Sequence, residues 1–206
     1  MGCSLDLELE CLAAGARVVA GLDEAGRGCL AGPVYAAAVI LPVDFIHPVL
    51  NDSKQLTARQ RELLFEELSS HPGVLIGCGV ATVREIERLN ILRASHLAMQ
   101  RAVEALPHRP DACLVDGLPI KNFPYSHRAV VSGDALSFSI AAASIVAKVT
   151  RDRFMRDLAL SFPLYGFEKH KGYGTADHLA ALDRHGPCEH HRATFGPVAQ
   201  LTLALD

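Results

Sequence analysis

Short apolar runs separated by Gly, Pro, Asp and Ser dominate the first two thirds of the chain. Runs of a few residues bounded by turn-forming residues are typical of buried strands. Only a Gly-rich stretch separates the first two runs, which favours a hairpin-like connection over a crossover helix. The five strands expected on this basis cover residues 18–23, 33–41, 74–80, 111–115 and 129–131.

Helical periodicity fills the intervals between these strands and follows the last of them. Thr57 and Thr82 are each placed as helix N-caps, and Pro107 ends the second of the two segments. The longest segment is alanine-rich and apolar nearly all round in its first half, so we expect it to pack centrally. The expected helices cover about 57–68, 82–106, 135–160 and 175–184. This alternation of strands and helices predicts an α/β layered domain.

Composition and charge narrow the class of protein. The chain has 206 residues, of which 50% are hydrophobic and 21% charged, and its formal net charge is -3. We expect one soluble domain over 1–206, with an α/β core over about 17–160 and a C-terminal loop and helical extension over about 161–206. No apolar stretch is long enough to span a bilayer and the N-terminus lacks a basic leader, which favours the cytoplasm. A nucleic-acid-binding face would have to be local.

The six cysteines are scattered and form no C-x-x-C pair. In a cytoplasmic protein this spacing indicates reduced thiols, most of them buried within or beside apolar runs. A zinc site at Cys188-Glu189-His190-His191 is a weaker alternative, since no second pair of ligands is apparent.

Carboxylates stand at the ends of three expected strands. Asp23-Glu24 ends the first, Asp116 the fourth, and Asp134 stands at the exit of the fifth. If these strands are adjacent and parallel, the acids meet at the sheet edge where α/β proteins bind ligands. Clustered carboxylates need cations, and Mg²⁺ or Mn²⁺ prefer such ligands. An acid that ends a strand is commonly just solvated, but the coincidence across strands predicts a metal-dependent phosphodiesterase.

Gly26-Arg27-Gly28 comes directly after the first acid pair. Two glycines around one arginine indicate a backbone that bends sharply or admits a close approach, and arginine offers a planar fork for phosphate. A charged hairpin turn is the simpler alternative. A dinucleotide-binding loop fits poorly, because such a loop opens a helix, whereas a proline and a strand follow here.

Further cations and one aromatic ring are available for nucleic acid near the same edge. The cations are Arg27, Lys54, Lys148, Arg151 and the Lys169-His170-Lys171 group. Each alone is equally compatible with an ordinary surface charge. Tyr173, between two glycines, suits stacking on a sugar or base, and a ring packed on the core is its alternative.

Taken together, these residues resemble ribonuclease HII, the bacterial type 2 ribonuclease H, from about residue 18 to residue 198. The motifs are Asp23-Glu24-Ala25-Gly26-Arg27-Gly28, Asp52-Ser53-Lys54-Gln55-Leu56, Val115-Asp116-Gly117, Gly133-Asp134, the stretch 141–152 and His170-Lys171-Gly172-Tyr173-Gly174-Thr175. So many blocks in one order make the resemblance specific. His191-Arg192-Ala193-Thr194-Phe195 matches the usual basic-Ser-Phe ending of the family only loosely. Gly26-Arg27-Gly28 and the short lead-in argue against ribonuclease HIII.

The resemblance implies a ribonuclease H-like fold, with a five-stranded mixed sheet, helices on both faces and a helical C-terminal extension. It implies a metal-dependent endoribonuclease that cuts the RNA strand of RNA–DNA hybrids. The same enzyme would nick duplex DNA 5′ to a single embedded ribonucleotide, as in ribonucleotide excision repair, and leave 5′-phosphate and 3′-hydroxyl ends. Mn²⁺ or Mg²⁺ would be the cofactor, in two-metal-ion catalysis. A monomer is expected, and no clamp-binding peptide is apparent.

The resemblance also implies roles for single residues. The catalytic acids that hold the metals would be Asp23, Glu24, Asp116 and Asp134. The 2′-hydroxyl of the ribonucleotide would be read by Gly26, Arg27 and Gly28, largely through backbone atoms. Tyr173 would stack on the following deoxyribose. The nucleic-acid backbone would be bound by Lys54, Lys148, Arg151 and Lys171.

Some alternatives remain at this stage. Asp152, inside the long helix, is expected first as a salt-bridge partner and second as a metal ligand. A non-catalytic nucleic-acid-binding module on the same fold is the alternative function, and an exonuclease or another phosphoryl-transfer enzyme is a third. The presence of all four acids favours an enzyme over the binding module. Gly26-Arg27-Gly28 together with Tyr173 favours an enzyme that reads a ribonucleotide over an exonuclease or another phosphoryl-transfer enzyme.

Overall fold

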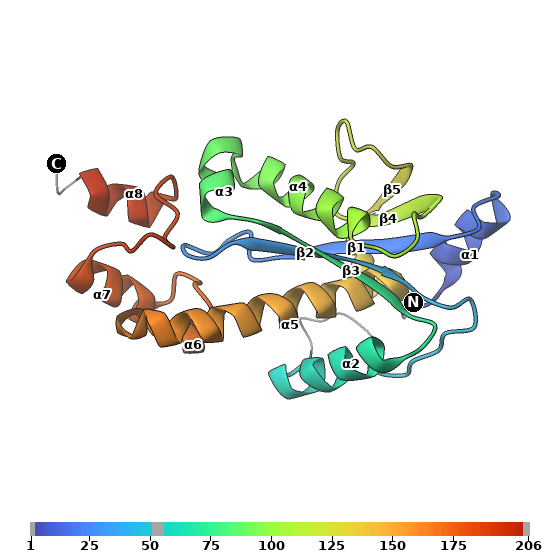
Figure 1. Ribbon diagram of the computed structural model, residues 1–206, viewed down its shortest axis with the longest axis horizontal. Helices are drawn as coiled ribbons and strands as arrows, with labels where there is room; N and C mark the ends of the chain where they lie inside the picture. Colours follow the sequence, from blue (N-terminus) through green and yellow to red (C-terminus); the bar gives the residue numbers. More distant parts are fainter. Residues whose placement is uncertain (1–2, 51–55, 204–206) are drawn as a thin grey trace.

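A mixed five-stranded sheet with helices on both faces forms the centre of the protein (Figure 1). The structure is a computed structural model that describes residues 3–50 and 56–203. The strands are β1 (Val19–Ala25), β2 (Val34–Ile40), β3 (Leu75–Ala81), β4 (Ala112–Asp116) and β5 (His127–Val130). They lie in the order β3-β2-β1-β4-β5. The fold class expected from the sequence is confirmed.

Strand direction divides the sheet into two halves. β2 runs antiparallel to both of its neighbours, β1 and β3, whereas β1, β4 and β5 run parallel to one another. The hairpin-like connection after β1 is therefore as expected, and the condition that the three acid-ending strands be adjacent and parallel is met. In the register Leu22 lies beside Val115, and Asp116 lies beside Val130. The carboxyl ends of β1, β4 and β5 consequently meet at one edge of the sheet.

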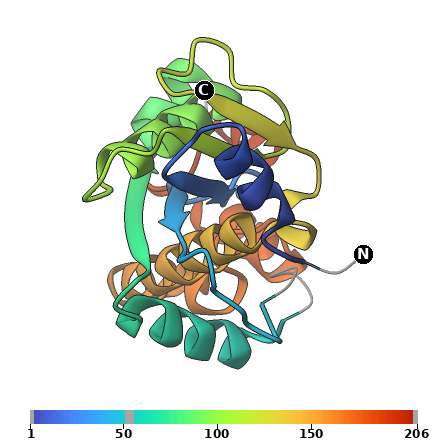
Figure 2. The same ribbon diagram turned by 90° about the vertical axis from the view of Figure 1, so that its right-hand side faces the viewer.

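The helices form layers on the two faces of the sheet. α4 (Ile91–Glu104) packs on one face with α3 (Val83–Leu89) next to it, and α5 (Phe138–Ser161) crosses the other face. α2 (Ala58–Ser70) packs on the outer side of α5, so Figure 2 shows the layers α2, α5, sheet and α4 in turn. Alternate residues of β2 point to opposite sides, and each side has its own hydrophobic core.

Small residues allow α5 to lie close to the sheet. A Cβ atom on Gly21 of β1 would come within 2.1 Å of the Ser139 carbonyl carbon, so only glycine fits at this crossing. Ala141, Ala142 and Ala143 are fully buried. The alanine-rich helix is central, as its sequence predicts, because small side chains permit a close approach of backbones.

The helix caps agree with the sequence, and one helix break does not. Thr57 and Thr82 each accept a hydrogen bond from the backbone amide three residues on, in capping boxes. The segment expected to be one helix over 82–106 is two helices. Asn90 separates them with a φ of 68°, and its side chain accepts a hydrogen bond from the Arg93 amide. Asparagine tolerates this left-handed conformation better than most residues.

The chain after α5 forms the C-terminal helical extension. Its helices are α6 (Phe167–His170), α7 (Ala176–His185) and α8 (Gly196–Leu203), and a 3-10 turn, η2 (Pro163–Tyr165), precedes them. Figure 1 shows them at one end of the sheet. An isolated bridge between Ala31 and His191 ties the extension to the loop that follows β1. This loop and the extension therefore form one packed unit.

The N-terminal helix α1 (Asp6–Ala13) is anchored to the start of α5. The buried carboxylate of Glu8 accepts hydrogen bonds from the Ser137 hydroxyl at 2.5 Å and from the Ser139 hydroxyl at 2.6 Å. Ser137 is also the N-cap of α5. The negative charge of Glu8 thus lies at the positive end of a long helix dipole, which stabilises the contact.

Two further expectations concern the membrane and the thiols. Within the described ranges, no helix has the length and apolar character needed to cross a bilayer. All six cysteines are free. Cys29 and Cys113 are buried, three others (Cys3, Cys11 and Cys188) are half-buried, and Cys78 is exposed. The expectation of buried thiols is therefore confirmed at Cys29 and Cys113 only, and it is wrong at Cys78.

Candidate active site

The acidic ends of β1 and β4 line a cavity of about 300 Å³ at the carboxyl edge of the sheet. Asp23 and Glu24 come from β1, and Asp116 ends the neighbouring parallel strand β4. The other lining residues are Ala25, Gly26, Arg27, Gly28, Arg61, Ser144, Lys148 and Tyr173. Three of the four predicted acids therefore lie at one site with most of the predicted substrate-binding residues.

Size alone does not single out this cavity. Hollows of about 450 Å³ and 660 Å³ lie beside α7 and α4. The acid-lined cavity differs in its chemistry, because it brings together carboxylates whose pKa values are displaced by burial and by one another. Such groups in a cleft are typical of functional sites.

Asp23 and Glu24 are costly to keep charged. Asp23 is only 6% exposed, and burial raises its pKa well above the usual range, with the Glu24 and Asp116 carboxylates adding to the effect. Burial also raises the pKa of Glu24, although the Arg27 guanidinium, 3.0 Å from Glu24 Oε1, opposes this rise. A hydrogen bond from Ser144 favours the charged form of Asp23. A bound cation would favour the charged forms of both acids.

Asp134 is placed differently from the other three acids. It lies in the 3-10 turn η1 (Gly133–Ala135), is 2% exposed, and does not line the cavity. The amide of the adjacent Gly133 donates to Asp116 Oδ1 at 2.7 Å. A Cβ atom on Gly133 would come within 2.5 Å of Ile140 Cδ1, so the turn packs tightly on α5. The turn that carries Asp134 therefore orients Asp116.

The donor set of the cavity fits a hard divalent cation. The candidate ligands are carboxylate oxygens, which Mg²⁺ and Mn²⁺ prefer. In the part of the chain that the structure describes, no three Asp, Glu, His or Cys side chains are grouped closely enough to hold an ion by themselves. Zinc at residues 188–191 therefore gains no support. Mg²⁺ commonly keeps water and binds through one or two carboxylates plus substrate phosphate, so the acids suit an ion that binds together with substrate.

A buried arginine of the C-terminal extension holds the glycine-rich loop. Arg192 is fully buried, and its guanidinium donates to the carbonyl oxygens of Gly26, Arg27 and Gly32 at 2.7 to 2.9 Å. Gly26 has a φ of 98°, and a Cβ atom there would meet the Arg151 side chain at 2.0 Å. Both conformation and space therefore require glycine at this position.

The outer side of the same loop is open. A Cβ atom on Gly28 would have no neighbour within 4 Å. The Arg27 side chain is 51% exposed and pairs with Glu24. The loop is thus held from within at the Gly26 and Arg27 carbonyls and is exposed to solvent at Arg27 and Gly28.

Arg151, predicted to bind the nucleic-acid backbone, lies beneath the cavity loops, with its guanidinium carbon 5.9 Å from the centroid of the Tyr173 ring. Arg151 is 1% exposed. Its guanidinium donates to the carbonyl oxygens of Ala31, Pro33 and Lys171 at 2.9 to 3.1 Å. The loops after β1 and before α7 close over this part of α5, so solvent does not reach the guanidinium. Arg151 supports the loops on both sides of the cavity.

The three predicted lysines have different environments. Lys148 lines the cavity and forms an ion pair with Asp152 at 2.8 Å, so Asp152 is the salt-bridge partner that the sequence favours. Lys171 is half-buried and does not line the cavity. Burial lowers the pKa of its ammonium group. Lys54 lies outside the described residues.

Tyr173 offers an exposed ring on a firmly held backbone. The residue is 40% exposed and lines the cavity, with Lys148 Nζ 5.3 Å from the ring centroid. Its amide donates to the His170 carbonyl at 2.9 Å, and its carbonyl accepts from the Thr175 amide at 2.8 Å. The ring is therefore presented to the cavity as stacking would require.

Several residues of the site have no individual signal in the sequence. Ser144 and Arg61 line the cavity, and Arg192 holds the glycine-rich loop. Ser144 belongs to a motif of the resemblance, but its position there does not reveal a bond to Asp23. Arg192 contacts a loop about 160 positions earlier, and no local pattern reports such a pairing.

Acid should destabilise the protein through a buried histidine. Burial lowers the pKa of His191 from 6.5 to about 4. A histidine whose pKa is lower in the folded protein than in the unfolded chain makes its full contribution to the free energy of unfolding at pH values above the unfolded-state pKa. That stability is lost as the pH falls toward 4, because the unfolded chain takes up the proton first. At pH 5 the expected loss from His191 is about 2 kcal/mol.

The measurement is the free energy of unfolding in urea near pH 7.5 and near pH 5, without divalent cations, for wild type and His191→Gln. Asp23 and Glu24 act in the opposite direction, because acids with raised folded pKa values stabilise the fold as the pH falls. Wild type and His191→Gln share Asp23 and Glu24, so the difference between the two proteins cancels the contribution of these acids to the free energy of unfolding. Wild type should lose about 2 kcal/mol more than the variant, and equal losses would contradict the low pKa of His191.

Comparisons with known proteins agree with this geometry. Residues 20–198 match the family model described as Ribonuclease HII. A ribonuclease HII of Burkholderia thailandensis is 54% identical over 186 residues, which cover 89% of this chain and 85% of that protein. The crystal structure of ribonuclease H2 from Pyrococcus horikoshii OT3 has a TM-score of 0.74 at 26% identity, covering 91% of this chain and 98% of that one. Bst-RNase HIII in complex with Mn²⁺ shares the fold, with a TM-score of 0.70 at 17% identity over 91% of this chain and 70% of that one.

Proposed function

This chain belongs to the ribonuclease HII family, and on that premise we propose that it is an endoribonuclease with two kinds of substrate. Ribonuclease H activity on RNA–DNA hybrids comes with the family. The finer proposal is that the protein also nicks duplex DNA on the 5′ side of a single embedded ribonucleotide, leaving 5′-phosphate and 3′-hydroxyl ends. The observation that carries it is that Asp23, Glu24, Asp116, Gly26-Arg27-Gly28 and Tyr173 line one cavity.

Asp23, Glu24 and Asp116 would hold Mn²⁺ or Mg²⁺, and Asp134 is proposed as the fourth acid of the set. Two such ions, when bound, stabilise the charge on a scissile phosphate and lower the pKa of water. The raised pKa values of Asp23 and Glu24 support this assignment, because cations remove the repulsion that causes part of the rise. Bst-RNase HIII, which shares the fold, has been solved with Mn²⁺.

The protein's own groups would position the nucleic acid. The exposed backbone at Arg27 and Gly28 suits hydrogen bonds to a 2′-hydroxyl, the group that distinguishes RNA from DNA. The ammonium group of Lys148, on the cavity wall, would contact a phosphate. Arg27 would keep Glu24 charged and oriented through their 3.0 Å contact. Tyr173 would stack on the sugar that follows the ribonucleotide.

The test is cleavage of a DNA duplex that contains one ribonucleotide, with Mn²⁺ or Mg²⁺, resolved on a denaturing gel. A single nick 5′ to the ribonucleotide is expected from wild type. The nick should be absent without metal and with Asp116→Asn. Cleavage of long hybrids without this nick would overturn the role given to Gly26-Arg27-Gly28 and Tyr173. Binding without any cleavage would instead indicate a non-catalytic nucleic-acid-binding module.

Substitutions at Tyr173 should separate the ring from its hydroxyl. Tyr173→Phe keeps the stacking surface and should change kcat/KM for nicking by about twofold or less. Tyr173→Ala should lower it by about 10- to 100-fold, if stacking on the sugar contributes as much as the stacking of a base on an aromatic ring, about 1–3 kcal/mol. Steady-state kinetics on the one-ribonucleotide duplex measure both values. Equally large losses in the two variants would show that the hydroxyl carries the role.

A further inference from the structure

Three buried histidines form a packed cluster under the Tyr173 loop. They are His170 at the end of α6, His178 in the first turn of α7, and His191 in the segment that follows α7. The rings of His170 and His178 are stacked, with centroids 4.3 Å apart and planes 14° apart. None of the three is more than 9% exposed, so each ring nitrogen needs a partner inside the protein.

The partners determine which nitrogen of each ring carries the proton. The Cys188 amide donates to His191 Nδ1 at 2.9 Å, so His191 carries its proton on Nε2. That nitrogen lies 3.0 Å from His178 Nε2, which must accept. The remaining nitrogen of His178, Nδ1, therefore bears a proton and donates it to the Tyr173 carbonyl at 2.9 Å. One directional chain of hydrogen bonds thus runs from Cys188 to Tyr173.

His170 is satisfied separately and supports the same loop. Its Nδ1 accepts from the Gly172 amide at 3.2 Å, and its Nε2 lies 2.7 Å from the Tyr165 carbonyl. Both ring nitrogens are therefore used with the imidazole neutral. The two stacked histidines hold the backbone on either side of the Gly172–Tyr173 peptide.

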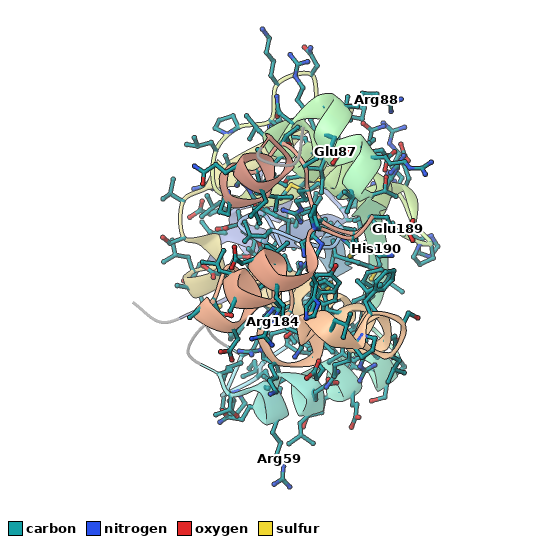
Figure 3. All side chains as sticks on the ribbon, turned by 90° about the vertical axis from the view of Figure 1, so that its left-hand side faces the viewer. Arg59, Glu87, Arg88, Arg184, Glu189 and His190 are labelled. Carbon is teal, nitrogen blue, oxygen red and sulfur yellow. The ribbon has the colours of Figure 1, made fainter. Side chains whose placement is uncertain are left out.

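The segment that carries His191 also holds the other substrate loop. Arg192, the next residue, donates its side chain to the Gly26 and Arg27 carbonyls and its amide to the Leu30 carbonyl at 2.8 Å. Figure 3 looks onto this end of the molecule, with His190 and Glu189 on the segment that follows α7, the helix of Arg184. Neighbouring residues of one segment therefore support both loops that line the cavity, Arg192 directly and His191 through His178.

We infer that His178 is a positioning residue that sets the place of Tyr173 against Gly26-Arg27-Gly28 through its hydrogen bond to the Tyr173 carbonyl. This inference rests on the proposed function, in which the Tyr173 loop and the Gly26-Arg27-Gly28 loop together read an RNA-to-DNA junction. His178 would control the distance between these two loops. A continuous hybrid offers RNA on both sides of the cut and depends less on Tyr173. His178 thus controls selectivity for the single ribonucleotide over the continuous hybrid.

Two substitutions of His178 each keep one of its two side-chain hydrogen bonds and remove the other. In His178→Asn the side-chain amide occupies the place of Nδ1 and can still donate to the Tyr173 carbonyl. In His178→Gln the amide reaches the place of Nε2, so it keeps the contact with His191 and loses the one with Tyr173. Both variants are polar and of similar size, and thermal melting checks that both are folded.

The readout is the ratio of kcat/KM for the one-ribonucleotide duplex to kcat/KM for a long RNA–DNA hybrid. His178→Gln should lower this ratio about tenfold, the equivalent of one ordinary hydrogen bond. His178→Asn should keep it within about twofold of wild type. Equal ratios in the two variants, or equal losses on both substrates, would overturn the inference and leave a purely structural role.

A double-mutant cycle gives the second measurement. If His178 acts through Tyr173, His178→Gln should have no further effect on nicking in a Tyr173→Ala background. The same loss with and without the Tyr173 ring would overturn the inference. Absence of the nick in wild type, with hybrids still cut, would instead overturn the proposed ribonucleotide reading itself, so the two failures are distinguishable.

Discussion

Asp23→Asn is expected to abolish cleavage and, at the same time, to stabilise the metal-free protein. Asp23 is 6% exposed, and burial together with the Glu24 and Asp116 carboxylates raises its pKa well above the usual range. Asparagine keeps the size of the side chain and removes the charge. In the absence of divalent cations the free energy of unfolding should rise by about 1–2 kcal/mol at neutral pH.

Activity should change in the opposite direction. Asp23 is proposed to hold the metal ions, and an amide is a much weaker ligand for Mg²⁺ or Mn²⁺ than a carboxylate. Losing one preorganised group of an active site commonly costs about 10²- to 10³-fold in kcat. We expect at least this loss for both the hybrid and the one-ribonucleotide duplex.

Three measurements test this prediction together. Urea unfolding gives the stability, gel assays give the activity, and melting with increasing Mn²⁺ reports metal binding without any turnover. Mn²⁺ should stabilise wild type by mass action and leave the variant largely unchanged. A variant that is active, or that is stabilised by Mn²⁺ as much as wild type, would contradict the assignment of Asp23.

Asp111→Asn is the matched control for the same chemical change. Asp111 is exposed, immediately precedes β4, and pairs with Arg17 at 3.5 Å. Hydrogen bonds from the Arg17 amide and side chain lower its pKa, the reverse of the shift at Asp23. The control should therefore lose a little stability and keep full activity, with no change in the response to Mn²⁺.

Arg192→Ala is expected to have the largest effect on stability. The guanidinium is fully buried and donates to the carbonyl oxygens of Gly26, Arg27 and Gly32. Its removal leaves these carbonyls without a partner, at about 1–3 kcal/mol each. Burial lowers the pKa of Arg192 to about 10, and the relief of this desolvation offsets part of the loss. The net decrease in the free energy of unfolding should be about 3 kcal/mol.

The same substitution should also change selectivity. Without the guanidinium the Gly26-Arg27-Gly28 backbone is free to move, so nicking at a single ribonucleotide should fall more than hybrid cleavage. Urea unfolding and kinetics below the melting temperature measure the two effects. Arg88→Ala, on the exposed side of α3 and labelled in Figure 3, is the control and should change stability by no more than about 0.5 kcal/mol. A loss below about 1 kcal/mol for Arg192→Ala would contradict the holding role.

The sequence predicted local elements well wherever a short-range interaction produces them. Thr57 and Thr82 cap their helices through residues three positions on. The strand ends that carry Asp23 and Asp116 also follow from apolar runs and the acids after them. The prediction of one long helix over 82–106 was wrong at Asn90, because the pattern of apolar residues does not reveal a positive φ at a single residue.

The sequence did not predict which side chains of one helix are exposed and which are buried. Lys148 and Arg151 lie three residues apart in α5, and both were predicted to bind the nucleic-acid backbone. The structure puts Lys148 on the cavity wall and buries Arg151 among backbone carbonyls. The difference arises from loops that pack over one part of the helix, and the positions of those loops are not encoded by the helix itself.

By itself the sequence therefore determined the order of elements, the acids at the strand ends and, through motif resemblance, the family and the kind of chemistry. These features depend on neighbours along the chain, and the sequence displays such neighbours directly. Only the tertiary structure decided that Asp134 lies off the cavity wall, that Arg192 holds the glycine-rich loop, and that His178 holds Tyr173. The last two depend on contacts between the C-terminal extension and the cavity loops. A buried polar group needs a hydrogen-bond partner, and that partner can come from any segment that folding brings next to it.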